Sequence, residues 1–164
     1  MLEIKDKSLL LNLDFSGKGG KEKQIKQLFP SFKRQHVKKL DFLCLEETIY
    51  YETKKQENQQ WFNLAKFYNL SKGEQRINLL FICFNKKDGL ADLIFCIEKG
   101  EFLNLLISDG ELKDAGWSMT AIEKAYDLVK IAPKLQPKAE VRIRKFYKNH
   151  NKEVKTIYNK NDIG

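Results

Sequence analysis

Asp41, Glu52 and Lys54 are residues whose types and spacing could support hydrolysis of a phosphate ester. Carboxylates are the preferred ligands of hard divalent cations such as Mg²⁺. A bound cation lowers the pKa of a water molecule and polarises a phosphoryl oxygen. A lysine beside the carboxylates could hold the attacking water or stabilise charge in the transition state. The three residues therefore predict a metal-dependent hydrolytic site, provided that the fold brings them together.

The elements that would position these residues are two short β-strands. Runs rich in apolar, aromatic and β-branched residues stand on either side of the polar Glu46-Glu47 break. This pattern predicts a β-hairpin whose turn is centred between the two glutamates. In that register Leu43 lies opposite Tyr50, and the paired positions continue outward from there.

The same register places Asp41 directly opposite Glu52, with facing Cβ atoms about 4.5–5.5 Å apart. Lys54 projects on the same face as Glu52, because side chains alternate along a strand. Two carboxylates about 4 Å apart repel by about 4 kcal/mol at an effective dielectric constant near 20, and a bound cation reverses that sign. The alternative is a solvated strand face, since acid-x-Lys tripeptides recur elsewhere in this lysine-rich chain.

This segment resembles the PD-(D/E)xK nuclease superfamily, whose core motif is an Asp on one strand and Glu-x-Lys on the next. Leu40-Asp41 followed by Glu52-Thr53-Lys54 is similar to that motif in phage-type junction resolvases and small type II restriction endonucleases. Leucine stands where the family name has proline, which many members lack. Members often add an acidic residue on a preceding helix, and Glu22 matches that place. The resemblance covers residues 16–85.

The resemblance implies an α/β fold with a restriction endonuclease-like core, in which a mixed central sheet is flanked by helices. It also implies hydrolysis of DNA phosphodiester bonds with Mg²⁺, with Mn²⁺ as an alternative ion. Asp41 and Glu52, together with the carbonyl of Thr53, would bind the metal. Lys54 would support the water and the transition state, and Glu22 would assist metal binding or position a water for proton transfer.

The charge distribution indicates a partner with a phosphate backbone. The net charge is +8, yet residues 18–39 carry eight Lys or Arg against one Glu, and residues 134–160 carry nine against two. Two basic blocks on a mildly acidic body are typical of a DNA-binding protein, although lysine-rich surfaces also serve solubility. The residues expected to contact DNA are Lys21, Lys23, Lys38, Lys39, Gln56, Arg142 and Arg144. For Gln56 a merely solvated side chain is an equal alternative. For residues 141–150 the equal alternative is a structural, amphipathic edge strand.

Composition limits the remaining classes. The chain of 164 residues is 42% hydrophobic, which suits one folded domain, with a basic C-terminal segment from about residue 134. No run approaches the roughly 20 apolar residues of a membrane span, and the first residues lack a signal-peptide pattern. Three cysteines lie in strand-like apolar runs, so we expect buried, reduced thiols and a cytoplasmic protein. With only two histidines, a Cys/His zinc site is not expected.

The rest of the sequence predicts further helices and strands around the hairpin. Residues 1–15 suggest an edge strand or an arm, and a short basic helix should end by Pro30. The other expected elements are helices at 57–69 and 118–132 and strands at 77–84, 90–98 and 102–107.

These observations favour a Mg²⁺-dependent endodeoxyribonuclease, and within that class a type II restriction-like enzyme. The compact size and the sizeable β region after the motif would allow a DNA sequence to be recognised. A Holliday junction resolvase is the rival, and a non-catalytic basic DNA-binding protein is the alternative from another class. Either nuclease would act as a homodimer, because cutting two strands needs two sites.

Overall fold

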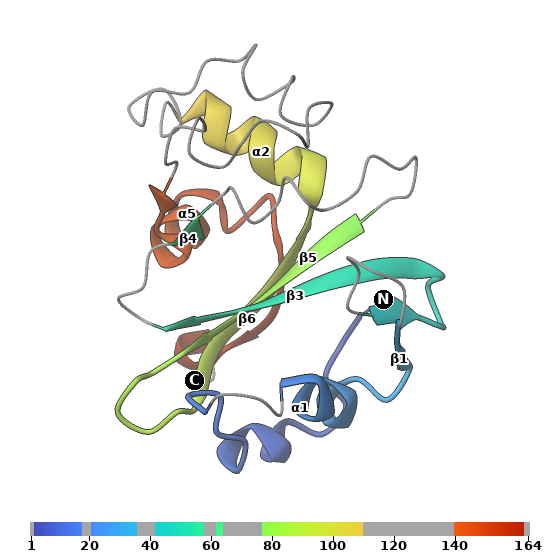
Figure 1. The fold of residues 1–164 in the computed structure, drawn as a ribbon. Helices are drawn as coiled ribbons and strands as arrows, with labels where there is room; N and C mark the ends of the chain where they lie inside the picture. The colour runs from blue at the N-terminus through green and yellow to red at the C-terminus, as the bar shows by residue number, and fades with distance from the viewer. Residues whose placement is uncertain are drawn as a thin grey trace.

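A computed structural model of the chain describes residues 2–17, 21–35, 42–57, 62–63, 77–109 and 140–162 (Figure 1). The helix expected at 118–132 lies outside these residues.

The fold is mixed α/β and is built on a six-stranded sheet with the order β1-β2-β3-β5-β6-β8. All neighbouring strands are antiparallel except β3 and β5, which are parallel. The strands are β1 (Phe32–Arg34), β2 (Phe42–Cys44), β3 (Ile49–Glu57), β5 (Ile77–Phe84), β6 (Ala91–Glu98) and β8 (Lys155–Asn159). A separate antiparallel pair is formed by β4 (Phe62–Asn63) and β7 (Glu140–Val141).

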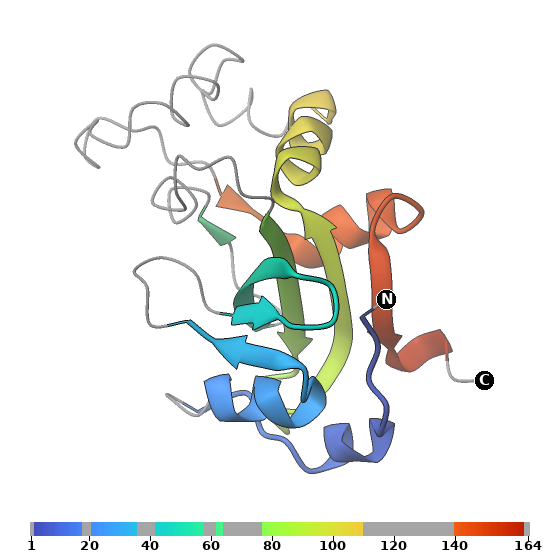
Figure 2. The same cartoon turned by 90° about the vertical axis from the view of Figure 1, so that its right-hand side faces the viewer.

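Within the described residues, three α-helices cover the two faces of the sheet (Figures 1 and 2). Helix α1 (Lys21–Leu28) lies on one face, and α2 (Lys99–Ser108) and α5 (Ile143–His150) lie on the other. The described part of the chain also contains two short 3₁₀ helices, η1 (Lys7–Leu11) and η4 (Lys160–Asp162). A mixed central sheet flanked by helices, as expected from the sequence, is therefore confirmed.

The face under α1 carries a hydrophobic core. Tyr51 of β3 points into it, together with alternate residues of the neighbouring strands and with Ile25 and Leu28 of α1. The N-terminal segment contributes Leu10 and Phe15, so it is neither an edge strand nor a free arm. Leu10 and Phe15 are buried because they close one side of this core.

The opposite face is closed by aromatic contacts. The ring of Phe81 on β5 lies 5.2 Å from that of Phe95 on β6 and 5.4 Å from that of Phe102 on α2. Phe146 of α5 adds an edge-on contact with Phe102 at 4.7 Å between ring centroids. Such offset and edge-to-face pairs are the favoured geometries for aromatic side chains. They fix α2 and α5 on the sheet face that carries Phe81.

The central strands follow the sequence pattern closely. β5 is buried on both faces over almost its whole length, which is why it appears in the sequence as a continuous apolar run. β6 begins one residue later than expected, at Ala91. The turn between the two strands ends at Gly89, whose φ of 72° lies in the left-handed region that glycine adopts without strain.

Replacing Gly89 with alanine should lower the free energy of unfolding by at least about 1–2 kcal/mol, the cost of a left-handed backbone for an L-residue. A Cβ at this position would also collide with the carboxylate of Asp14, which is held there by the backbone N–H of Ser16 at 2.8 Å. Urea denaturation would measure the change. Gly17→Ala is the matched control, because a Cβ at Gly17 has no atom within 4 Å and should change stability little. Equal effects of the two substitutions would contradict the argument.

The strand expected at 102–107 is wrong, because these residues belong to helix α2. The carboxylate of Glu98 accepts a hydrogen bond from the backbone N–H of Glu101 at 2.9 Å, which satisfies a donor at the start of the helix. Phe102 and Leu106, four residues apart, are both buried. That spacing is helical, and a short apolar run does not separate the two possibilities by itself.

The amphipathic edge strand considered for residues 141–150 is also wrong, since Ile143–His150 form helix α5. Ile143, Phe146 and His150 are buried at helical spacing, and lysines occupy the outer side.

The helix expected at 57–69 is wrong for those of its residues that the structure describes. Glu57 ends strand β3 and residues 62–63 form β4. Among the helices that the structure describes, none is both long and apolar enough to span a bilayer.

Candidate active site on strand β3

The hairpin formed by β2 and β3 has the register expected from the sequence. Leu43 pairs with Tyr50, and Phe42 pairs with Tyr51. Thr48 closes the turn with a positive φ of 55°, and its N–H donates to the carbonyl of Cys44 at 2.8 Å. Asp41 lies outside the described residues, so its expected place opposite Glu52 stays a prediction.

Glu52 and Lys54 are brought together on one face of β3. The Lys54 Nζ atom lies 3.0 Å from Glu52 Oε1. The Glu52 side chain is 8% exposed and that of Lys54 is 25% exposed, so the ion pair is largely removed from solvent. The expectation that these two side chains share a face and meet is confirmed.

The neighbours of this pair on β5 are apolar. Glu52 is the cross-strand neighbour of Leu79, and Lys54 is that of Phe81, so the pair borders the face closed by the aromatic cluster. Charges taken out of water pay a desolvation cost, and their mutual attraction grows in a medium of low polarisability. In such a place few water molecules compete with a ligand for the oxygens of the glutamate.

A hard cation such as Mg²⁺ is the metal suited to the oxygen donors at this face. Glu52 offers a carboxylate, and Thr53, whose side chain is fully buried on the other face, could offer only its backbone carbonyl. Within the described residues, no three His, Cys, Asp or Glu side chains gather closely enough to hold a metal ion. The second carboxylate of the predicted metal site is Asp41, which lies outside them.

Glu22 forms an ion pair with Arg34. Its carboxylate lies 2.8 Å from an Nη atom of Arg34, and both side chains are exposed to a substantial degree. Its helix packs on the sheet face that carries Tyr51, and successive residues such as Tyr51 and Glu52 point to opposite faces. A role for Glu22 at the metal stays a prediction, and the structure gives it a surface ion pair.

Gln56 is the third polar residue on the face of Glu52 and Lys54, and it is only 4% exposed. The sequence left open whether it is a solvated side chain, and its burial shows that it is not. Its cross-strand neighbours are Cys83 on β5 and, one strand further, Leu93 on β6.

The residues expected to contact DNA have different environments. Lys23 and Arg142 are exposed, and Lys21 begins helix α1. Lys38 and Lys39 lie outside the described residues. DNA contact by any of these residues stays a prediction.

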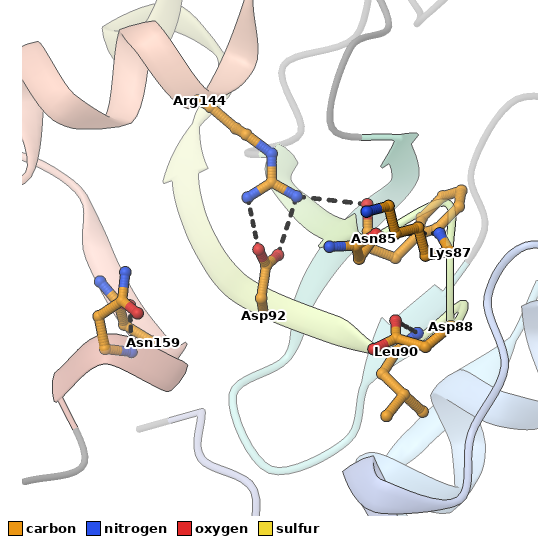
Figure 3. Close-up of polar contacts among 9 residues, drawn as sticks. Asn85, Lys87, Asp88, Leu90, Asp92, Arg144 and Asn159 are labelled. Atoms are coloured by element: carbon orange, nitrogen blue, oxygen red, sulfur yellow. Dashed lines mark hydrogen bonds and ion pairs between the residues drawn. The ribbon is translucent and has the colours of Figure 1, made fainter.

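Arg144 is engaged by the protein itself (Figure 3). Its two Nη atoms lie 2.8 and 2.9 Å from the two carboxylate oxygens of Asp92, and one of them also donates to the carbonyl of Phe84 at 3.3 Å. The register of β5 and β6 explains this arrangement: Cys83 pairs with Leu93 and Phe84 pairs with Ala91, so Asp92 is the extra residue of a β-bulge. Bulges redirect a side chain out of its normal alternation. Sequence patterns do not reveal where a bulge falls, so this clamp was not predicted.

Arg144→Ala should lower the free energy of unfolding by about 2 kcal/mol, because it removes charge-assisted hydrogen bonds from a partly buried carboxylate. Arg144→Lys should recover little of this loss, since an ammonium cannot form the two parallel bonds. The matched control is Arg34→Ala, which removes the more exposed pair with Glu22 and should cost less than about 1 kcal/mol. Urea denaturation of the three variants gives the comparison. A loss for Arg144→Ala no larger than the control's would contradict a structural role.

A second contact that the sequence did not indicate joins α2 to α5. The Nε2 atom of His150, the last residue of α5, lies 2.6 Å from a carboxylate oxygen of Asp109, directly after α2. His150 is buried, and its ring lies 4.9 Å from that of Phe146. The sequence does not predict this pairing, because the two residues are 41 positions apart in the chain.

The three cysteines are free and buried, as expected. Burial raises the pKa of the Cys83 thiol to about 12 and that of the Cys96 thiol to about 11. Thiols in this state are protonated at neutral pH and are poor nucleophiles. Neither of these two cysteines is therefore a candidate for covalent catalysis.

Comparison of the chain with protein-family models, with curated proteins and with solved structures finds no match.

Proposed function

We propose that this protein is a Mg²⁺-dependent endodeoxyribonuclease with a restriction endonuclease-like core. The observation that carries the proposal is the pairing of Glu52 and Lys54, 3.0 Å apart, on one face of β3. The two residues lie on the second strand of a hairpin whose register would bring Asp41 opposite Glu52. The mixed sheet with helices on both faces supports the same class of fold.

Each residue has a role that follows from its chemistry. Glu52, with Asp41 and the carbonyl of Thr53, would hold the metal, which when bound would activate water and polarise a phosphoryl oxygen. Lys54 would orient the attacking water and stabilise the charge that develops on the phosphate. The apolar surroundings of the pair keep competing water away from both groups. Glu22 would act at the metal or through a water.

The basic character of the chain supports DNA as the substrate. The net charge is +8, and exposed cations such as Lys23 and Lys148 could contact phosphates. Contacts of this kind give affinity without sequence selectivity and weaken as salt rises. We favour a type II restriction-like enzyme that acts as a homodimer in the cytoplasm. A Holliday junction resolvase remains the rival proposal, and a non-catalytic DNA-binding protein is the alternative from another class.

The test is incubation of the purified protein with plasmid DNA and with a synthetic four-way junction, each with MgCl₂, with MnCl₂ or with EDTA. Discrete plasmid fragments that require the metal would support the restriction-like enzyme. Paired symmetric nicks near the branch point of the junction would support the resolvase. Binding without scission at every metal concentration would leave only the non-catalytic DNA-binding protein.

A further inference from the structure

The sheet face that carries Glu52 and Lys54 continues across β2 to the edge strand β1. Residues paired directly across strands share a face, and Lys33 of β1 pairs with Leu43 of β2, which pairs with Tyr50 of β3. Tyr50 is two residues before Glu52, so side-chain alternation puts both on the same face. Lys33, Leu43 and Tyr50 therefore form a strip that leads from the candidate active site to the edge of the sheet.

This strip is open to solvent, unlike the part of the same face on β5 and β6. There Phe81 and Phe95 are completely buried and contact aromatic rings of α2 and α5. Leu43 and Tyr50 are only partly buried, and Lys33 is exposed. A ligand can therefore reach the side chains of the strip.

Lys33 is a cation that the described protein does not neutralise. Within the described part of the chain it forms no ion pair. Its chain neighbour Arg34 points to the opposite face, where it lies 2.8 Å from the carboxylate of Glu22. Lys54 is likewise engaged, by Glu52 at 3.0 Å. An exposed ammonium group without a carboxylate partner is suited to a phosphate oxygen.

The spacing of the strip matches that of a nucleic acid strand. Lys33 is two strands across from Tyr50, with about 4.8 Å between neighbouring strands, and Tyr50 is about 6.7 Å along β3 from Glu52. The Cα atoms of Lys33 and Glu52 are then roughly 12 Å apart. Successive phosphates of a nucleic acid strand are separated by about the distance between Tyr50 and Glu52. Lys33 is therefore about two phosphates away from a phosphate held at Glu52.

We propose that Lys33 binds a phosphate of the DNA strand that is cut, about two phosphates from the reacting one, and that this strand crosses β3, β2 and β1 along the strip. The proposal rests on the nuclease function above and adds to it a substrate-binding residue and a path for the substrate. It also divides the basic block at 18–39. Lys23 and Lys26 lie on α1, which covers the other face of the sheet, and would serve only DNA that passes that face.

The test compares Lys33→Ala with Lys26→Ala, which also removes one exposed lysine but from α1. Affinity is measured by fluorescence anisotropy in CaCl₂ at several salt concentrations, with the plasmid sequence or junction that the wild-type protein binds best. Lys33→Ala should weaken binding about fivefold and should reduce the steepness of log affinity against log salt by about 0.9, the value for one lost phosphate contact on duplex DNA. Lys33→Arg keeps the charge and should bind like the wild-type protein.

The control variant should show a smaller loss of affinity and an unchanged salt dependence, because its lysine faces away from the strip. Both lysines are exposed, so thermal unfolding should differ little among the variants. Equal effects of Lys33→Ala and Lys26→Ala on DNA binding would overturn the proposal.

A set of DNA molecules, each with one phosphate replaced by an uncharged methylphosphonate, locates the contact. The wild-type protein should lose about fivefold in affinity when the contacted phosphate is replaced, and the Lys33→Ala protein should lose nothing further there. That phosphate should lie about two positions from the cleaved bond. Additive losses at every position, with cleavage intact, would overturn this proposal alone. If the wild-type protein binds DNA but does not cut it, the nuclease function fails, and the same comparison still judges the contact with Lys33. Absence of DNA binding would overturn both.

Discussion

Replacing Lys54 with alanine is expected to slow DNA cleavage by about 100-fold or more, the usual cost of removing one preorganised group that stabilises a transition state. DNA affinity should change little, because Lys54 is one of 30 lysine and arginine residues and its side chain is three-quarters buried. The effect should therefore appear in kcat. Single-turnover cleavage with MgCl₂ gives the rate, and anisotropy in CaCl₂ gives the affinity.

The matched control for this experiment is Lys87→Ala. Lys87 is exposed in the turn between β5 and β6, and its backbone N–H donates to the side chain of Asn85 at 2.9 Å (Figure 3). Both variants lose one positive charge, so a general electrostatic effect on DNA binding would be shared by them. Unchanged turnover in Lys54→Ala would remove this residue from the mechanism. A purely structural pair with Glu52 would be indicated by a loss of stability without a loss of turnover.

Phe81→Ala is expected to cost about 3–5 kcal/mol of unfolding free energy, as for other fully buried aromatic side chains. Phe81 is completely buried and packs on Phe95 and Phe102, so its removal leaves a cavity between the sheet and α2. Many domains have a total stability of only about 5–15 kcal/mol, so this loss is a large part of the whole. Urea denaturation followed by circular dichroism measures it.

Leu45→Ala provides the control for Phe81→Ala. Leu45 follows β2 and is 57% exposed, so its truncation should change stability by less than about 0.5 kcal/mol. Phe81→Leu should lie between the two, since it keeps most of the apolar volume. A small effect of Phe81→Ala would mean that α2 does not depend on this aromatic contact. Because Phe81 is the cross-strand neighbour of Lys54, cleavage by this variant should fall as well.

The hairpin and the central strands could be predicted from sequence because their determinants are local. The β2–β3 register follows from the polar break between two apolar runs, and Leu43 indeed pairs with Tyr50. β5 is a continuous apolar run because both of its faces are covered. The shared face of Glu52 and Lys54 then follows from strand alternation alone.

The elements that sequence patterns missed are decided by contacts between distant residues. The run 102–107 is short and apolar and suits a strand or a helix equally, and the contact of Phe102 with Phe81 accompanies the helix. In residues 141–150 the alternation of apolar and basic residues concealed the helical spacing of Ile143 and Phe146.

Of the candidate site, only the arrangement of residues along the single strand β3 could be predicted from the sequence. Burial of Gln56 depends on two neighbouring strands, and the clamp between Arg144 and Asp92 depends on a bulge in β6. Residues 52 positions apart form that clamp, and no periodic pattern connects them. Glu22 was assigned by resemblance, and the structure pairs it with Arg34, a neighbour on the next element of the chain.

The parallel pairing of β3 with β5 has a consequence for how the protein folds. A hairpin can form as soon as its two strands have been synthesised, whereas parallel neighbours need a connection that returns the chain to the same end of the sheet. β3 therefore gains one neighbour early, through β2, and its second neighbour only once β5, which begins at Ile77, has been synthesised. Contacts of this kind slow folding, and an unpaired strand edge invites association with other chains. The strand that carries Glu52 and Lys54 thus depends on a late event for its final environment.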